Sequence, residues 1–190
     1  MLRGEGLSFI EMEDLSLHIL DIVENSIIAG ANKIEIRILE DLKNDIFSVE
    51  IKDNGKGMNE DILKKVTDPF CTTRTTRRVG LGLSFLSQSA KEAEGDLSVI
   101  SKEGEGTVVY AYFKHSHIDR KPLGNIVDTL ITLIVGSPDI DFLYEHRRNG
   151  NTYSLDTKEI KAELEGIPLN SPAVIRIIRE DIKNWLKSLS

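Results

Sequence analysis

The chain has 190 residues, with 24 Lys or Arg, 31 Asp or Glu and a single Cys, and its 40% hydrophobic content is enough for a globular core. The net charge of -7 argues against sequence-independent binding of nucleic acid, which requires a basic surface. One Cys excludes an internal disulfide and a Cys-based zinc site, and no apolar run approaches the roughly 20 residues of a membrane span, so we expect a cytoplasmic protein.

The first 115 residues predict an alternation of helices and strands. Apolar residues at three- and four-residue spacings predict a helix over 14–29, and alternating patterns predict two strands, KIEIRILE and IFSVEIKDNG. A short acidic helix (NEDILKKV), a loop and a helix over 81–93 follow, and DLSVISKEGEG with TVVYAYFK predicts a closing hairpin. This order is typical of an α+β two-layer sandwich with helices on one face of a mixed sheet.

The remaining residues predict a separate unit. HSHIDRKP interrupts the pattern, so we expect a domain over 1–115 and a small C-terminal α/β appendage over 116–190. The appendage is predicted to contain an apolar helix (GNIVDTLITLIVG), a hairpin around RRNGN, where Asn-Gly suits a type I′ turn, and two helices. The last helix would be capped by Ser171 with Pro172 in its first turn, and His146 is expected on the surface at a strand end.

The motif DNGKGM follows the second predicted strand and includes Asp53, Gly55 and Gly57. Glycine lets backbone approach a flat ligand closely. A carboxylate only accepts hydrogen bonds, so Asp53 suits the exocyclic amino group of adenine and repels the carbonyl that guanine has there. A plain β-turn at a strand end is the alternative, and DNGKGM alone favours that alternative.

Asp21 and Asn25 are four residues apart on the first predicted helix and therefore share a face. An amide oxygen suits Mg²⁺, which binds nucleotide phosphates with few protein ligands. The Asp21 carboxylate is suited to orient a water or accept a proton. A polar pair on an amphipathic helix is the alternative, which is weakened because Asn25 and Ser26 interrupt the apolar run.

The predicted loop after the acidic helix concentrates positive charge in an acidic segment. Arg74, Arg77 and Arg78 lie among four threonines, and VGLGLS then begins a helix. Arginine complements a polyphosphate, and the backbone N–H groups at a helix start favour phosphate, which Gly80 and Gly82 would admit. A flexible polar loop with a solubilising charge run is the alternative.

Taken together, the motifs resemble those of the Bergerat-fold (GHKL) ATPases, which include gyrase, heat-shock chaperone, histidine kinase and mismatch-repair ATPases. DIVENSIIAGA resembles the N box, DNGKGM the G1 box, DPFCTT the F box and VGLGLS the G2 box, over about residues 14–114. The final GEGTVVYAYF resembles the last strands of histidine kinase catalytic domains, and DPFCTTR with GLGLS makes that branch the most similar. The resemblance implies a two-layer α/β fold that binds ATP and Mg²⁺.

The resemblance also implies a role for each matching residue. Asn25 would hold Mg²⁺, and Asp53 would recognise adenine. Asp21 stands where many relatives have the Glu that activates water, although its side chain is one methylene shorter. The remaining nucleotide contacts would come from Gly55, Gly57, Met58, Phe70, Gly80, Leu81, Gly82, Leu83 and Thr107, and the transferred phosphoryl charge would be stabilised by Arg74, Arg77 and Arg78.

Only about 14 residues precede the N-box helix, too few for the helical hairpin on which a sensor histidine kinase carries its phosphoacceptor His. We therefore expect a Mg²⁺-dependent ATP-binding signalling protein that phosphorylates a separate protein partner, as anti-sigma factor kinases or the catalytic half of a split histidine kinase do. A nucleotide-gated binding module with little turnover is the alternative that the short Asp21 favours. A conformational ATPase is disfavoured because residues 116–190 lack a transducer signature, and a homodimer is left open.

Overall fold

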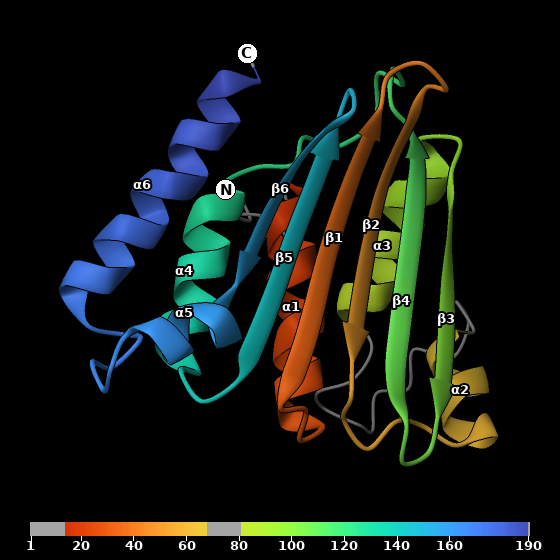
Figure 1. Cartoon of the computed structure of the whole chain (residues 1–190). Helices are drawn as coiled ribbons and strands as arrows, with labels where there is room; N and C mark the ends of the chain where they lie inside the picture. Colours follow the sequence, from red (N-terminus) through yellow and green to blue (C-terminus); the bar gives the residue numbers. More distant parts are fainter. Residues whose placement is uncertain (1–13, 68–80, 190) are drawn as a thin grey trace, which may run out of the picture.

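The computed structural model describes residues 14–67 and 81–189, which form one six-stranded sheet with helices packed on it (Figure 1). The strands are β1 (Lys33–Asp41), β2 (Ile46–Asp53), β3 (Asp96–Lys102), β4 (Gly106–Lys114), β5 (Asp141–Arg148) and β6 (Asn151–Asp156). The helices are α1 (Leu15–Ile28), α2 (Glu60–Thr67), α3 (Leu81–Glu92), α4 (Ile126–Gly136), α5 (Thr157–Glu163) and α6 (Pro172–Ser188). Within the described residues, no helix is both long and apolar enough to cross a membrane.

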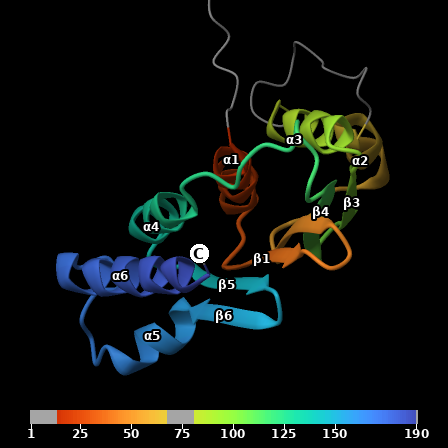
Figure 2. The ribbon, with the colours of Figure 1, turned by 90° about the horizontal axis from the view of Figure 1, so that it is seen from above.

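The sheet is mixed, with the strand order β3-β4-β2-β1-β5-β6. All neighbouring strands are antiparallel except β1 and β5, which run parallel. Seen from above, α1, α3 and α4 lie on the same side of the sheet (Figure 2). The predicted α+β sandwich with helices on one face of a mixed sheet is therefore confirmed.

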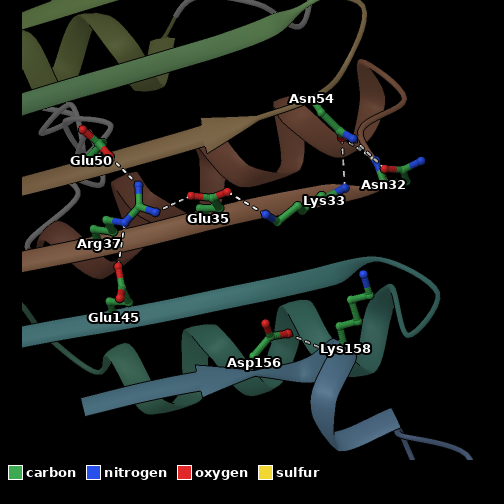
Figure 3. Close-up of polar contacts among 9 residues, drawn as sticks. All are labelled: Asn32, Lys33, Glu35, Arg37, Glu50, Asn54, Glu145, Asp156 and Lys158. Atoms are coloured by element: carbon green, nitrogen blue, oxygen red, sulfur yellow. Dashed lines mark hydrogen bonds and ion pairs between the residues drawn. The ribbon is translucent and has the colours of Figure 1, made fainter. Parts of the chain in front are cut away.

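The two faces of β1 show how the sequence determines which side the helices cover. Ile34, Ile36 and Ile38 alternate along the strand and are at most 1% exposed, so they form the centre of the core. Glu35 and Arg37 point to the opposite face. There the Arg37 guanidinium bonds Glu35 and two carboxylates from neighbouring strands, Glu50 at 2.8 Å and Glu145 at 2.6 Å (Figure 3). The charged face needs no covering layer, as is common for sheets rich in antiparallel pairs.

The C-terminal segment adds to this same sheet. β5 pairs with β1 in continuous register from Lys33 opposite Asp141 to Glu40 opposite Arg148. The segment before α4 is tied to the start of α1 by two backbone hydrogen bonds of 2.9 Å, donated by residues 15 and 16. Residues 116–190 therefore contribute strands and core to the layer that contains the N-terminal motifs, and a domain boundary at residue 115 stays a prediction.

Local predictions in the C-terminal segment had mixed outcomes. Asn149 and Gly150 have φ values of 50° and 83°, as both positions of a type I′ turn require. Ser171 occupies the position before α6, but its side chain makes no capping hydrogen bond, so the prediction that Ser171 caps this helix through its side chain is wrong. His146 is fully buried, so its predicted surface position is also wrong.

Candidate functional site

Asp53 is the last residue of β2, and its carboxylate is held from two sides. The side chain is almost buried, with the residue 8% exposed. Its Oδ1 accepts a hydrogen bond of 2.8 Å from the Gly55 N–H, and its Oδ2 accepts one of 2.8 Å from the Ser26 hydroxyl. Each carboxylate oxygen has more than one acceptor position. The carboxylate is thus fixed by neutral donors and retains capacity for a further donor such as an amino group.

Ser26 positions Asp53 from α1, although sequence analysis assigned it no role. Its hydroxyl is buried, and it also approaches the Ile22 carbonyl oxygen, one turn earlier, at 3.3 Å. The contact spans 27 residues of sequence, so no local pattern predicts it. The one available signal was the break that Asn25 and Ser26 make in the apolar run of α1.

Asn25, the predicted Mg²⁺ ligand, lies next to Ser26 and is half-buried. Its Nδ2 donates a hydrogen bond of 2.9 Å to the Asp21 carbonyl oxygen within the helix. This bond engages the donor end of the amide, so Oδ1 is the end suited to bind a cation. One helical turn therefore contains both the candidate metal ligand and the serine that braces the Asp53 carboxylate.

The loop after β2 packs on the β3–β4 hairpin. Gly57 has φ +63°, and a Cβ on it would lie 2.0 Å from the Lys102 carbonyl oxygen, so only glycine fits there. The Met58 N–H donates to the Ser101 hydroxyl at 2.9 Å, and that hydroxyl is 2.9 Å from the Thr107 hydroxyl. Gly57 thus has a packing requirement that the sequence did not reveal, and its approach to a ligand stays a prediction.

Thr107 is directly opposite Asp53 in the pairing of β2 with β4. Cross-strand partners place their Cβ atoms about 5 Å apart on the same face of a sheet. The structure therefore gathers four predicted residues, Asp53, Gly55, Met58 and Thr107, at one end of the sheet, beside the turn of α1 that contains Asn25.

Asp21 and Gly82 meet between α1 and α3. The Asp21 carboxylate accepts a hydrogen bond from the Gly82 N–H, in the first turn of α3. Burial raises the pKa of this carboxyl, and the Gly82 N–H opposes that rise. A Cβ on Gly82 would lie 1.6 Å from the Asp21 Oδ2, so the carboxylate fills the space that any larger residue would need.

Several predicted site residues lie outside the described residues: Phe70, Arg74, Arg77, Arg78 and Gly80. The side chain of Leu81 is likewise not described, whereas Leu83 is half-buried against the core. Among the residues that the structure describes, no group of three or more His, Cys, Asp or Glu side chains could hold a metal ion. The predicted Mg²⁺ site differs in kind, because a nucleotide-bound Mg²⁺ takes most of its ligands from phosphates and water.

Comparison with a solved structure supports the fold. The N-terminal domain of a DNA repair protein superposes with a TM-score of 0.57 at 20% sequence identity, covering 77% of this chain and 53% of that chain. At this identity the likeness establishes architecture alone.

Similar sequences come from bacterial proteins that are named as kinases. An NtrY-like protein of Rickettsia conorii, named as a sensor histidine kinase, is 29% identical over 111 residues, which are 58% of this chain and 18% of the relative. Sporulation kinase E of Bacillus subtilis is 42% identical over 69 residues, covering 36% of this chain and 9% of the kinase. Tetrathionate sensor histidine kinase TtrS of Salmonella typhimurium is 33% identical over 101 residues, covering 51% of this chain and 17% of the kinase. The chain therefore spans less than a fifth of the length of these relatives.

The family model described as histidine kinase-, DNA gyrase B- and HSP90-like ATPase matches residues 12–117, more than half of the chain. The match contains α1, β1, β2, α2, α3, β3 and β4, and with them the residues gathered around Asp53. Such a domain in relatives of sensor histidine kinases supports an ATP-binding module of the signalling-kinase type. The chain belongs to the histidine kinase-, DNA gyrase B- and HSP90-like ATPase family.

Proposed function

We propose that this chain binds Mg·ATP at the Asp53 end of its sheet and transfers the γ-phosphoryl group to a separate protein. The observation that supports ATP most directly is the Asp53 carboxylate, which is nearly buried and held by Ser26 and Gly55 without a cationic partner among the described residues. Adenine offers an amino group to such an acceptor, whereas guanine offers a carbonyl oxygen.

The neighbouring residues suit the rest of a nucleotide. Asn25, one residue from the Ser26 brace, would bind Mg²⁺ through Oδ1, and Thr107 would lie near the adenine end. Bound Mg²⁺ supplies charge neutralisation on the phosphates. Arg74, Arg77 and Arg78 would add positive charge for the transferred group.

The positions of the histidines support transfer to another protein. The chain has four, at 18, 115, 117 and 146, and all lie within the described residues. His115 and His117 follow the end of β4, where Lys114 pairs with Ile46 of β2. Ile46 is seven residues from Asp53 along β2, so this end of the sheet is about 23 Å from Asp53. His18 and His146 are fully buried. None of the four is positioned as an acceptor for a phosphoryl group held beside Asn25.

A nucleotide-gated binding module is the second candidate. The Asp21 carboxylate is engaged by Gly82, and its side chain is shorter than the Glu that activates water in many relatives. Both features favour slow turnover, because a general base must be within hydrogen-bond reach of its water.

Nucleotide selectivity tests the proposal. Calorimetric titration of the pure chain with Mg·ATP and Mg·GTP should give an affinity for ATP at least about tenfold higher, since one lost charged hydrogen bond and an unpaired acceptor cost about that factor. Asp53→Ala should remove ATP binding, whereas Asp96→Ala, at an exposed position on the edge strand β3, should not. Equal affinities for both nucleotides, or ATP binding that survives in Asp53→Ala, would refute the adenine assignment.

Phosphoryl transfer distinguishes the two candidates. With γ-labelled ATP and bacterial protein fractions, the kinase proposal predicts label on a second protein and no stable label on this chain. Tight ATP binding without labelling of any protein would favour the gated module. Label that is retained on this chain would contradict transfer to a partner.

A further inference from the structure

The contact between Asp21 and Gly82 suggests a role for Asp21 other than proton transfer. The carboxylate comes from the middle of α1 and bonds the backbone N–H of the second residue of α3. The absence of a side chain at Gly82 is what lets the two helices approach here, because a Cβ would lie 1.6 Å from Oδ2. The contact therefore joins α1, which contains Asn25, to the start of α3.

The chemistry of this contact is that of an anion at a helix start. The first N–H groups of a helix have no partners within it, and their partial positive charge favours an anion. A nucleotide phosphate uses the same groups when it binds at a helix start. The Asp21 carboxylate thus supplies from within the chain the kind of group that a phosphate would supply.

We propose that Asp21 is a positioning residue: its carboxylate holds the first turn of α3 against α1 and gives up that position when a nucleotide phosphate binds. The second half of this statement rests on the proposed function, whereas the first half does not. The bond from the Gly82 N–H gives the Asp21 carboxylate a contact between the two helices that a proton-transfer role does not require. The positioning role and the base role predict different behaviour for the same substitutions.

The positioning half is tested without nucleotide by amide hydrogen exchange at the start of α3. Asp21→Asn keeps an oxygen that can accept the Gly82 N–H, so exchange of residues 82–85 should stay within about threefold of the wild type. Asp21→Ala removes the acceptor and should speed exchange about tenfold or more. Gly82→Ala should act like Asp21→Ala, because its methyl group displaces the carboxylate. Unchanged exchange in both alanine variants would overturn the positioning role.

The displacement half is tested by the affinity for Mg·ATP. Asp21→Asn removes a negative charge that must leave before phosphate binds, so ATP should bind about three- to tenfold more tightly. Glu24→Gln removes one charge from the exposed side of the same helix and should change this affinity by no more than about twofold. Unchanged or weaker ATP binding in Asp21→Asn would overturn the displacement role.

The two halves keep this inference separate from the proposed function. If the wild-type chain binds no ATP, both the proposed function and the displacement half of the inference are refuted. The exchange measurement still decides whether Asp21 holds α3, because it requires no ligand.

Discussion

Two nearly buried carboxylates at different ends of the sheet are held in opposite ways. Asp53, at the end of β2, receives hydrogen bonds from a hydroxyl and a backbone N–H, both neutral donors. Glu40, near the end of β1, accepts a hydrogen bond of 2.8 Å from the His146 Nε2 and lies 3.4 Å from the His115 Nε2. It also forms an ion pair with Arg148, whose Nε is 3.5 Å away. Neutral donors orient a carboxylate and leave its charge uncompensated, whereas cationic and imidazole donors compensate the charge locally.

The surroundings of the two carboxylates differ in the same sense. The Glu40 end is closed by aromatic rings, because Trp185 of α6 packs 4.8 Å from the His146 ring and 5.2 Å from the Tyr153 ring. The Asp53 end is bordered by a glycine-containing loop and short hydroxyl side chains. We infer that Glu40 stabilises the fold, while Asp53 is available to a ligand. The predictions below test this distinction.

Removal of Glu40 should have the largest effect on stability. Glu40→Ala leaves the Nε2 donor of the buried His146 without its acceptor, so the free energy of unfolding should fall by about 3 kcal/mol. Denaturant unfolding followed by circular dichroism would measure this. ATP affinity of the folded variant should be unchanged, and a loss of affinity comparable to that of an Asp53 variant would show that the two ends are not independent.

The opposite pattern is expected for Asp53→Asn. The amide retains similar size but lacks the charge, so Mg·ATP affinity should fall about 30-fold, which corresponds to about 2 kcal/mol. The free energy of unfolding should change by less than about 1 kcal/mol, because the donors on Asp53 are neutral. Calorimetry and denaturant unfolding of the same sample would test both parts, and a large loss of stability would place Asp53 in the same structural class as Glu40.

The contrast between these two ends also shows what the sequence could reveal. The alternation in β1, the Asn149–Gly150 turn and the helix starts are local patterns, so the elements were predicted with small shifts at their ends. The burial of His146 depends on Trp185, which is 39 residues later in the chain, and on parallel pairing with β1. Such contacts are non-local and leave no periodic signal in the sequence.

The candidate site was predictable to the extent that its motifs are contiguous. Asp53, Gly55 and Asn25 lie in short segments that resemble known boxes, and the structure brings those segments together. The bond from Ser26 to Asp53 and the bond from Gly82 to Asp21 join residues 27 and 61 positions apart. Only the packing of α1 against β2 and α3 creates them, so residue type and spacing could not predict either.

A third buried polar group, His18, has no partner of either kind in the described part of the chain and extends the comparison. It is 0% exposed, and neither ring nitrogen has a hydrogen-bond partner among the described residues. Burial, together with the positive charge of Lys121 and despite the opposing effect of Asp14, lowers the pKa of His18 to about 4.

Acidification should therefore destabilise the fold through His18. The unfolded chain binds this proton below its ordinary pKa of 6.5, whereas the folded chain does not until about pH 4, so stability is lost as the pH falls through that window. Between pH 7.5 and pH 5 the expected loss is about 2 kcal/mol. His18→Leu should remove most of this loss in denaturant unfolding at the two pH values. An unchanged pH dependence in the variant would show that other groups cause it.

The smallest expected effect concerns the brace on Asp53. Ser26→Ala removes one neutral hydrogen bond to the carboxylate while the Gly55 N–H remains, so Mg·ATP affinity should fall about fivefold, or about 1 kcal/mol. Ser89→Ala is the matched control, because Ser89 is equally buried and its hydroxyl has no partner among the described residues. If both alanine variants weaken ATP binding to the same extent, the effect of Ser26 comes from packing. If only Ser26→Ala does, the orientation of the Asp53 carboxylate contributes to nucleotide recognition, and the lack of a cationic partner for Asp53 among the residues that the structure describes has a functional reason.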